Sequence, residues 1–323
     1  MPNNGNYTTT RPTFPSHGET LAGILCTPTS AGPHPAVVLL GPYSFQKEQA
    51  PWHYACRLAD EGYVALAFDP RTVGASTGVP RRLENPVMKN EDAVAAIDYL
   101  CSLSSVDSAR IYAAGICQGG PELLDVASRE PRLRAVACVT GYFRDEETDA
   151  FMIAAGVTLD PFDPATAPSA AEIAALKAAR LARAAAAKEV YDATGEVVYA
   201  PLVSPELGDR ERGSDAGLPG PLVWSWYGPW TLRGWENRYA IMSDLDHFAY
   251  STVEGVAALR TPALVVHGDL CMNPAAARRH FSSIPTGDKK LVWDNGVNHF
   301  QYYDQPDVVD RTAGEIARWF NAH

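Results

Sequence analysis

The sequence lacks the features that suit a nucleic-acid or membrane partner. Its 38 aspartates and glutamates outnumber 27 lysines and arginines, which gives a formal charge of −11 at pH 7. The basic residues form only short pairs such as Arg81-Arg82 and Arg278-Arg279, whereas phosphate backbones and anionic lipids are bound by a concentrated positive surface. No apolar run approaches the roughly 20 residues that cross a bilayer. We therefore expect neither nucleic acid nor membrane as a partner.

Metal-binding and secretory patterns are also absent. The six cysteines show no C-x-x-C or similar ligand spacing, so we expect no metal and no other cofactor. Residues 1–14 hold no apolar segment of the kind that secretory signals contain. These patterns predict a cytoplasmic protein with reduced thiols, a setting in which a reactive cysteine can persist.

Short apolar runs alternate with longer amphipathic stretches along most of the chain. The apolar runs predict buried strands at Ala36–Leu40, Tyr63–Phe68, Ile111–Gly115, Ala135–Thr140, Ala263–His267 and Lys290–Trp293. The amphipathic stretches predict helices at Lys47–Asp60, Pro86–Leu103, Gln118–Arg129, Pro274–Phe281 and Asp307–Phe320. Glu19–Cys26 predicts an antiparallel edge strand. The alternation predicts an α/β fold, with a mostly parallel sheet and helices on both faces.

Residues 146–257 interrupt this alternation. Ser169 and Glu172 have the spacing of a capping box, and an alanine-rich helix is predicted from Ala170 to its end before Gly195. Four of the seven tryptophans follow between Trp224 and Trp235. We interpret residues 146–257 as a helical cap inserted into a core made of residues 1–145 and 258–323.

The sharpest local signal lies where a predicted strand runs into a predicted helix, in the sequence GICQGG at residues 115–120. This is the G-x-nucleophile-x-G pattern of a nucleophile elbow, with Cys117 as the nucleophile. The glycines have a steric reason, because side chains beside a tight, strained turn would collide with the adjacent strand and helix. The dipole of the following helix favours the thiolate. Cys117 is therefore the candidate nucleophile, and a buried structural cysteine is the alternative.

His299 is the candidate general base. It lies in a glycine-bearing segment after the last predicted strand. Hydrolases with such an elbow carry their residues in the chain order nucleophile, acid, histidine, with the histidine at this place. His267 closes the preceding strand, and we interpret it as a packed structural residue.

Two carboxylates compete for the role of triad acid. The loop after the next-to-last strand is the usual place, and Asp269 is its only carboxylate, because Cys271 stands where many relatives carry the acid. Asp145 lies just past the strand that follows the nucleophile helix, and an acid there can also reach the histidine from a neighbouring strand. Either residue would hold the imidazole tautomer and stabilise the imidazolium. We favour Asp145 and keep Asp269 as the alternative.

Two backbone amides are the candidate oxyanion-hole donors. The amide of Gln118, directly after the nucleophile, would face a developing oxyanion. The second donor should come from the loop after Ala36–Leu40, where Pro42 has no N–H, and we prefer Tyr43 to Ser44. The candidate substrate-binding residues are aromatic residues of the cap, which could equally pack the cap on the body: Trp224, Trp226, Tyr227 and Trp230.

These motifs resemble a known family. Phe68–Gly78 is similar to the FDxRGxGxSxG segment of α/β-hydrolases, although Thr72 stands where that segment has glycine. Four further segments resemble a dienelactone-hydrolase-like branch that includes cysteine-nucleophile polyketide transferases and Dieckmann cyclases: Gly115–Gly120, Gly141–Asp145, Asn237–Ser243 and His299–Asp304. The resemblance runs from about Glu19 to Phe320 and is weakest in the cap. It implies the α/β-hydrolase fold and a Cys-Asp-His triad with its acid at Asp145.

Together, the motifs and the family resemblance predict an acyl-transfer enzyme of the thioesterase or esterase type. Such an enzyme would form an S-acyl-cysteine intermediate from an ester, lactone or thioester. If an external nucleophile or an internal carbanion takes the acyl group instead of water, the enzyme is an acyltransferase or a Dieckmann-type cyclase that releases a polyketide or peptide. A catalytically inactive small-molecule-binding protein is the second alternative. The expected partner is a small acyl substrate, either free or bound to a carrier protein. The sequence does not give the oligomeric state.

Overall fold

The computed structural model describes residues 5–147, 169–204, 216–219 and 221–323. The chain divides into two compact units. The first consists of Met1–Gly78, Val87–Phe143 and Thr252–His323, and the second of Val79–Pro86 and Arg144–Ser251. Val79–Pro86 and Asp145, which were predicted to belong to the core, fall in the second unit.

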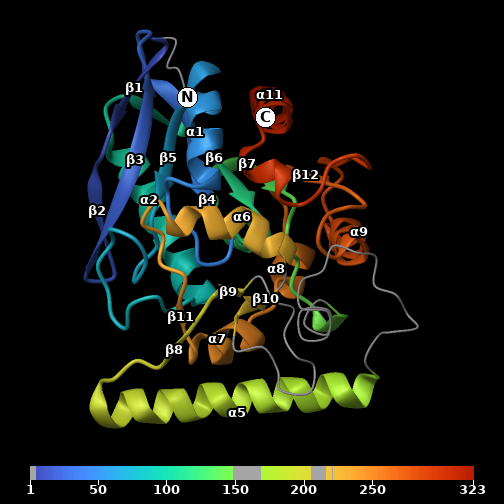
Figure 1. The fold of residues 1–323 in the computed structure, drawn as a ribbon. Helices are drawn as coiled ribbons and strands as arrows, with labels where there is room; N and C mark the ends of the chain where they lie inside the picture. The colour runs from blue at the N-terminus through green and yellow to red at the C-terminus, as the bar shows by residue number, and fades with distance from the viewer. Residues whose placement is uncertain (1–4, 148–168, 205–215, 220) are drawn as a thin grey trace. The chain divides into compact units, whose positions relative to one another are not determined.

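The first unit is built on a mixed, mostly parallel sheet (Figure 1). Its strands follow the order β1-β3-β5-β4-β6-β7-β12-β13, with β2 paired beside β3. Their bounds are β1 (Tyr7–Thr10), β2 (Thr13–Ser16), β3 (Glu19–Pro28), β4 (His34–Leu40), β5 (Val64–Phe68), β6 (Val106–Ile116), β7 (Leu133–Val139), β12 (Ala263–His267) and β13 (Lys289–Trp293). β3 is antiparallel to β5 as expected, but it is not the predicted edge strand, because β1 pairs with its other side. Six consecutive strands of the sheet run parallel to one another, which confirms the predicted sheet: β5, β4, β6, β7, β12 and β13.

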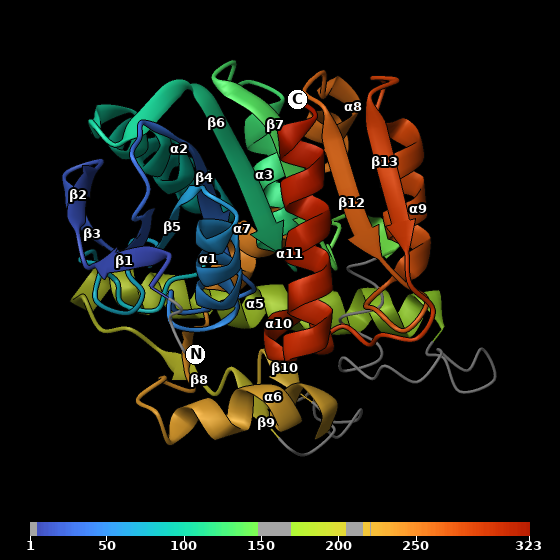
Figure 2. The same cartoon turned by 90° about the horizontal axis from the view of Figure 1, so that it is seen from above.

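Helices cover both faces of this sheet (Figure 2). α1 and α11 pack against each other on one face, and α2, α3 and α9 lie on the other. The helices are α1 (Ala50–Asp60), α2 (Pro86–Ser102), α3 (Gly119–Ala127), α8 (Val253–Ala258), α9 (Pro274–Ser283), α10 (Gln301–Asp304) and α11 (Pro306–Asn321). Because both faces are covered, the central strands are apolar along their length, and every residue of β5 is fully buried.

The parallel strands bring distant parts of the sequence to one edge of the sheet. Pairing aligns Leu40 of β4 with Gly115 of β6, and Ile116 of β6 with Val139 of β7. β12 pairs in parallel with both β7 and β13. The segments that follow these strands therefore meet at the carboxyl edge, where ligands of open α/β sheets usually bind.

The second unit contains helices and short strand pairs. Its longest helix, α5 (Ala170–Thr194), begins at the predicted capping box, in which Ser169 and Glu172 exchange side-chain-to-amide hydrogen bonds. Gly195 ends α5 with a left-handed φ of 76°. The other elements in the described part of this unit are β8 (Tyr199–Ala200), β9 (Val203–Ser204), β10 (Leu218–Pro219), α6 (Pro221–Thr231), β11 (Tyr239–Ala240) and α7 (Ser243–Ala249). Arg180 of α5 holds the buried Asp244 of α7 with two hydrogen bonds of 2.7 and 2.9 Å.

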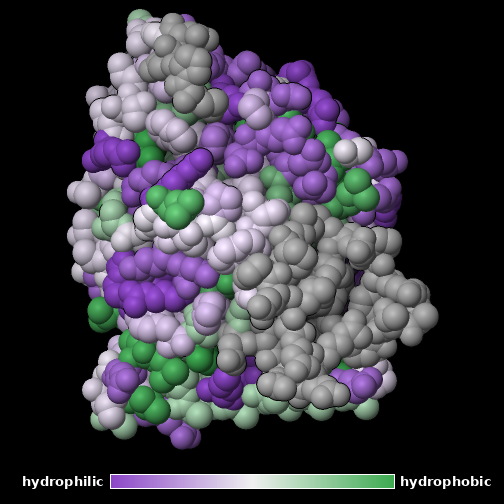
Figure 3. Space-filling model, viewed as in Figure 1, coloured by the Kyte–Doolittle hydropathy of each residue, from purple (hydrophilic) through white to green (hydrophobic). Residues whose placement is uncertain are grey.

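Hydrophobic side chains on the face shown in Figure 3 form small groups separated by hydrophilic residues. Among the residues that the structure describes, the large hydrophobic ones that are exposed are Val79, Val87, Val190, Leu232, Val253 and Leu270. Scattered exposure of this kind is normal for a protein surface. Among the described helices, none has both the length and the apolarity that crossing a bilayer requires.

The capping box generates a prediction for the stability of α5. Replacing Ser169 by Ala removes the acceptor for the Glu172 amide, and we expect a loss of about 1 kcal/mol in the stability of the first helical turn. Hydrogen exchange of the amides at the start of α5 measures the change. Ser169→Thr keeps a hydroxyl and serves as the control. Unchanged exchange in Ser169→Ala would contradict the prediction.

Candidate active site

Cys117 sits on a strained turn between β6 and α3. Its φ of 55° lies in the left-handed region, which is unfavourable for a residue with a Cβ. The amide of Cys117 donates to the carbonyl of Val139 at 3.0 Å. The carbonyl of Cys117 accepts from the amides of Gly120 and Tyr142, each at 3.0 Å. These bonds hold the thiol-bearing residue at the carboxyl edge of the sheet.

The glycines around the turn are required by close backbone contacts. A Cβ on Gly115 would lie 2.1 Å from the carbonyl oxygen of Gly119. A Cβ on Gly119 would lie 2.6 Å from the carbonyl oxygen of Leu40. Backbone atoms cannot yield to such an approach without displacing a strand or the helix. The steric reason predicted for these glycines is therefore confirmed.

Two amides from different loops converge on one sulfur atom. The backbone N–H groups of Gln118, in the elbow, and Tyr43, in the loop after β4, both donate hydrogen bonds to the sulfur of Cys117. An acyl carbon bonded to that sulfur would hold its carbonyl oxygen close to the same amides, which is the arrangement of an oxyanion hole. The structure thus brings together the predicted nucleophile and both predicted donors.

The surroundings of Cys117 favour the neutral thiol over the thiolate. Burial is the largest influence and raises its pKa to about 11. The hydroxyl of Tyr303 and the two amides oppose this rise by donating hydrogen bonds to the thiolate, and the charge of Lys89 opposes it as well. Desolvation outweighs these opposing contributions. Cys117 is therefore a neutral thiol at pH 7, and the thiolate favoured by the sequence argument is not its resting state.

A buried ion pair braces the elbow. Lys89 Nζ of α2 lies 3.3 Å from Glu122 Oε2 of α3, and Gln118 Nε2 donates to Glu122 Oε1 at 2.7 Å. All three side chains are buried. The pair therefore fixes the residue whose amide faces Cys117. Removal of one charged partner would leave the other buried and uncompensated, at a cost of about 3–5 kcal/mol.

His299 is fully buried in the segment after β13. Its Nε2 lies 3.1 Å from the hydroxyl oxygen of Tyr303. In the described part of the chain, no hydrogen bond joins His299 directly to Cys117, and the Tyr303 hydroxyl contacts both. Burial, followed by the influence of His267, holds the pKa of His299 well below its ordinary value of 6.5. The imidazole is therefore neutral at pH 7 and able to accept a proton.

Two groups of the first unit meet the other ring nitrogen of His299. The amide of Met272 can only donate, and at 3.3 Å from Nδ1 it favours the tautomer with the proton on Nε2. The hydroxyl of Thr140, at 2.8 Å, can either donate to Nδ1 or accept from it, so it is compatible with both tautomers. Among the described residues of this unit, no carboxylate contacts the ring. The first unit alone leaves both tautomers available.

The two candidate acids lie in different environments. Asp269 is exposed, and its carboxylate accepts from Trp293 Nε1 at 3.0 Å and from Arg278 at 3.3 Å. It makes no hydrogen bond to His299. Asp145 belongs to the second unit, and its role as the triad acid stays a prediction.

The four predicted substrate-binding aromatics lie on α6 in the second unit. Trp226 packs edge-on against Tyr227 at a centroid distance of 4.6 Å and lies 6.0 Å from Trp230. Tyr227 also lies 5.2 Å from Trp235. Trp226 and Tyr227 are buried, while Trp224 and Trp230 are partly exposed. The buried rings favour a packing role within the unit, and a substrate role for the four residues stays a prediction.

Sequence reasoning missed two side chains that hydrogen-bond to the imidazole. Tyr303 follows His299 by four residues, the spacing of one helical turn, so a signal for it was present in the sequence. Thr140 comes directly after β7 with a φ of 43°. Its contact with His299 depends on the neighbouring loops, which no local pattern gives.

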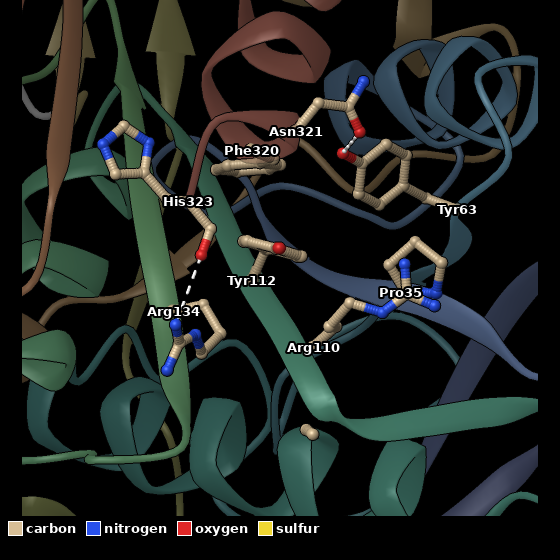
Figure 4. Close-up of a pocket in the computed structure, with 9 residues that line it drawn as sticks. Pro35, Tyr63, Arg110, Tyr112, Arg134, Phe320, Asn321 and His323 are labelled. Atoms are coloured by element: carbon tan, nitrogen blue, oxygen red, sulfur yellow. Dashed lines mark hydrogen bonds between the residues drawn. The ribbon is translucent and has the colours of Figure 1, made fainter.

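A separate cavity of about 460 Å³ lies beside the amino-terminal half of β6 (Figure 4). Tyr112 and Phe320 form its aromatic wall, with their rings stacked at 4.6 Å. Arg110 and Arg134 also line it. Cys117 follows the carboxyl end of β6, so this cavity is distinct from the candidate active site.

A family model matches most of the chain. The model is described as X-Pro dipeptidyl-peptidase (S15 family), and the match covers residues 17–276. It includes Cys117 with its elbow and ends before His299.

Individual relatives match over shorter stretches. Uncharacterized protein YcjY of Escherichia coli is 44% identical over 105 residues, which cover 32% of this chain and 34% of that protein. Thiohydrolase apmlB of Arthrinium phaeospermum is 33% identical over 122 residues, which cover 38% of this chain and 39% of that protein. The matched stretches thus span little more than a third of each relative. The crystal structure of the alpha/beta hydrolase GrgF from Penicillium has a TM-score of 0.75 at 20% identity, covering 97% of this chain and 99% of that chain, which supports the fold.

The raised pKa of Cys117 predicts how its alkylation depends on pH. With a pKa of about 11, roughly one thiol in 10⁴ is ionised at pH 7. We expect slow reaction with iodoacetamide at pH 7 and a roughly tenfold rise per pH unit up to about pH 10. Peptide mapping measures the rate and separates Cys117 from Cys56, whose pKa is lowered to about 7. A rate that has already reached its plateau at pH 7 would show a resting thiolate instead.

Proposed function

The chain belongs to the X-Pro dipeptidyl-peptidase (S15) family, which is of the α/β-hydrolase type, and we propose that it catalyses acyl transfer through an S-acyl intermediate on Cys117. The observation that carries the proposal is the convergence of the Gln118 and Tyr43 amides on the sulfur of Cys117. A structural cysteine needs no such pair of donors. The thiohydrolase among the relatives supports thioesters as the substrate class.

The proposed reaction has two halves. The sulfur of Cys117 attacks the acyl carbon while His299 takes its proton, and the two amides stabilise the tetrahedral oxyanion. The bond to the leaving thiol or alcohol then breaks, and the leaving group departs with the proton. In the second half water attacks the S-acyl group, His299 accepts a proton from it, and the acid is released as the sulfur regains its proton.

The cysteine favours thioesters and activated esters over peptides. A thiolate is a comparable leaving group to the thiol of a thioester, so the tetrahedral intermediate can partition forward. The nitrogen of an amide is a poorer leaving group, and its expulsion requires full protonation. We therefore propose a thioesterase or esterase rather than a peptidase.

We propose Asp145 as the acid that selects the productive tautomer of His299. Asp145 follows Thr140, which already contacts Nδ1, by five residues. The carboxylate of Asp269 is engaged by Arg278 and Trp293. An acid at Nδ1 would keep the proton there and leave Nε2 free to accept one.

The nucleophile and base are tested by substitution. Because no other described group replaces a thiol at the elbow, we expect Cys117→Ala and His299→Ala to lower kcat by at least about 10³-fold on a 4-nitrophenyl ester or a short-chain acyl thioester. Product analysis identifies the acceptor, with free acid expected from hydrolysis. Cys101→Ala, which changes a half-buried cysteine of α2, is the control and should keep wild-type activity. Wild-type turnover by Cys117→Ala would refute the nucleophile.

The acid is tested by a pair of matched variants. Asp145→Asn should lower kcat by at least about tenfold, because the imidazole loses the group that fixes its tautomer. Asp269→Asn removes only a surface contact and should leave kcat unchanged. The opposite pattern, with activity lost only in Asp269→Asn, would move the acid to Asp269.

A further inference from the structure

Tyr303 occupies the space between the two reacting groups of the first unit. It lies on α10, is 1% exposed, and its ring meets that of His299 at a centroid distance of 5.5 Å. Its hydroxyl oxygen is 3.1 Å from His299 Nε2 and hydrogen-bonds to the sulfur of Cys117. One hydroxyl group therefore contacts both the proton donor and the proton acceptor of the proposed reaction.

The two reacting side chains have no direct hydrogen bond to each other in the described structure. In the usual cysteine-histidine arrangement the imidazole contacts the sulfur itself and takes its proton in one transfer. Here Nε2 instead contacts the hydroxyl of Tyr303, which can donate one proton and accept another at the same time. Cys117, Tyr303 and His299 therefore form a continuous row of hydrogen-bonded groups.

We propose that Tyr303 is a catalytic residue that relays the proton between Cys117 and His299. The S–H bond of Cys117 breaks as its proton passes to the hydroxyl oxygen of Tyr303. In the same step the original hydroxyl proton passes to Nε2. The products are a thiolate and an imidazolium, and the tyrosine stays neutral with one proton, so no oxidant or further reactant is needed.

In the later steps the proton moves along the same three residues in the opposite direction. The imidazolium returns a proton to the tyrosine oxygen while the hydroxyl proton passes to the leaving group. Once the thiolate forms, the hydroxyl of Tyr303 donates to it and stabilises it, in the contact that the structure records. The inference rests on the proposed function, because it assigns the proton path of that same acyl transfer.

The relay requires a lone pair on Nε2. The Thr140 hydroxyl, 2.8 Å from Nδ1, can accept the Nδ1 proton and so allows this tautomer. The burial of Cys117, Tyr303 and His299 also favours a relay over separate ionisations of the thiol and the imidazole. Both the thiol and the imidazole are more stable uncharged in this environment, so the charges should form only together and as the substrate reacts.

The test is Tyr303→Phe, with Tyr302→Phe as the matched control. Both tyrosines lie on α10 and are buried. Of their two hydroxyls, that of Tyr303 contacts His299 and that of Tyr302 does not. For Tyr303→Phe we expect kcat on a slow-leaving thioester to fall about 100-fold with KM nearly unchanged, since proton transfer by a positioned group contributes roughly 10²–10⁴-fold. Tyr302→Phe should keep the wild-type kcat. Equal kcat in Tyr303→Phe and wild type would overturn the relay.

A second measurement needs no variant and separates this inference from the proposed function. A relay moves two protons as Cys117 attacks, so the single-turnover rate at which a slow-leaving thioester acylates the wild-type enzyme should depend on the deuterium fraction of the solvent along a curve. A straight line would mean one transferred proton and would overturn the relay even if Tyr303→Phe failed to fold. If Cys117→Ala also turned over substrate normally, the proposed function would fail with it; if Cys117→Ala were inactive, only the relay would be lost.

Discussion

Three hydrogen bonds to one buried sulfur atom organise the candidate site. They come from the amides of Gln118 and Tyr43 and from the hydroxyl of Tyr303, which belong to three separate segments of the chain. The left-handed turn at Cys117 makes this convergence possible, because it holds the sulfur at the edge where the parallel strands end. The flanking glycines allow the turn, and the parallel order of β4, β6 and β7 brings the loops together.

The site is built for charges that form during reaction rather than before it. Burial keeps the thiol of Cys117 protonated and the imidazole of His299 neutral. In such a low-dielectric environment, hydrogen-bond donors that are already aimed at the sulfur stabilise developing charge more strongly than water would. The buried pair of Lys89 and Glu122 serves the same end, because it holds the elbow residue Gln118 in place.

Much of the fold was predictable, because it depends on patterns that repeat along the chain. The alternation of apolar runs and amphipathic stretches predicted the parallel strands, and the glycines around Cys117 predicted the turn. The pattern misplaced the edge of the sheet, because the short strand β1 carries too few residues to show a period. The contacts of His299 were harder to foresee. Thr140 meets it through neighbouring loops, and the local four-residue spacing to Tyr303 shows proximity without showing that the hydroxyl also reaches Cys117.

The proposed acyl transfer requires a covalent bond between substrate and Cys117, and mass spectrometry of the acid-quenched protein during turnover of an acyl thioester tests this bond most directly. We expect the protein to gain the mass of one acyl group, and we expect this mass to map to the peptide containing Cys117. Turnover with the acyl group attached to another residue would contradict it.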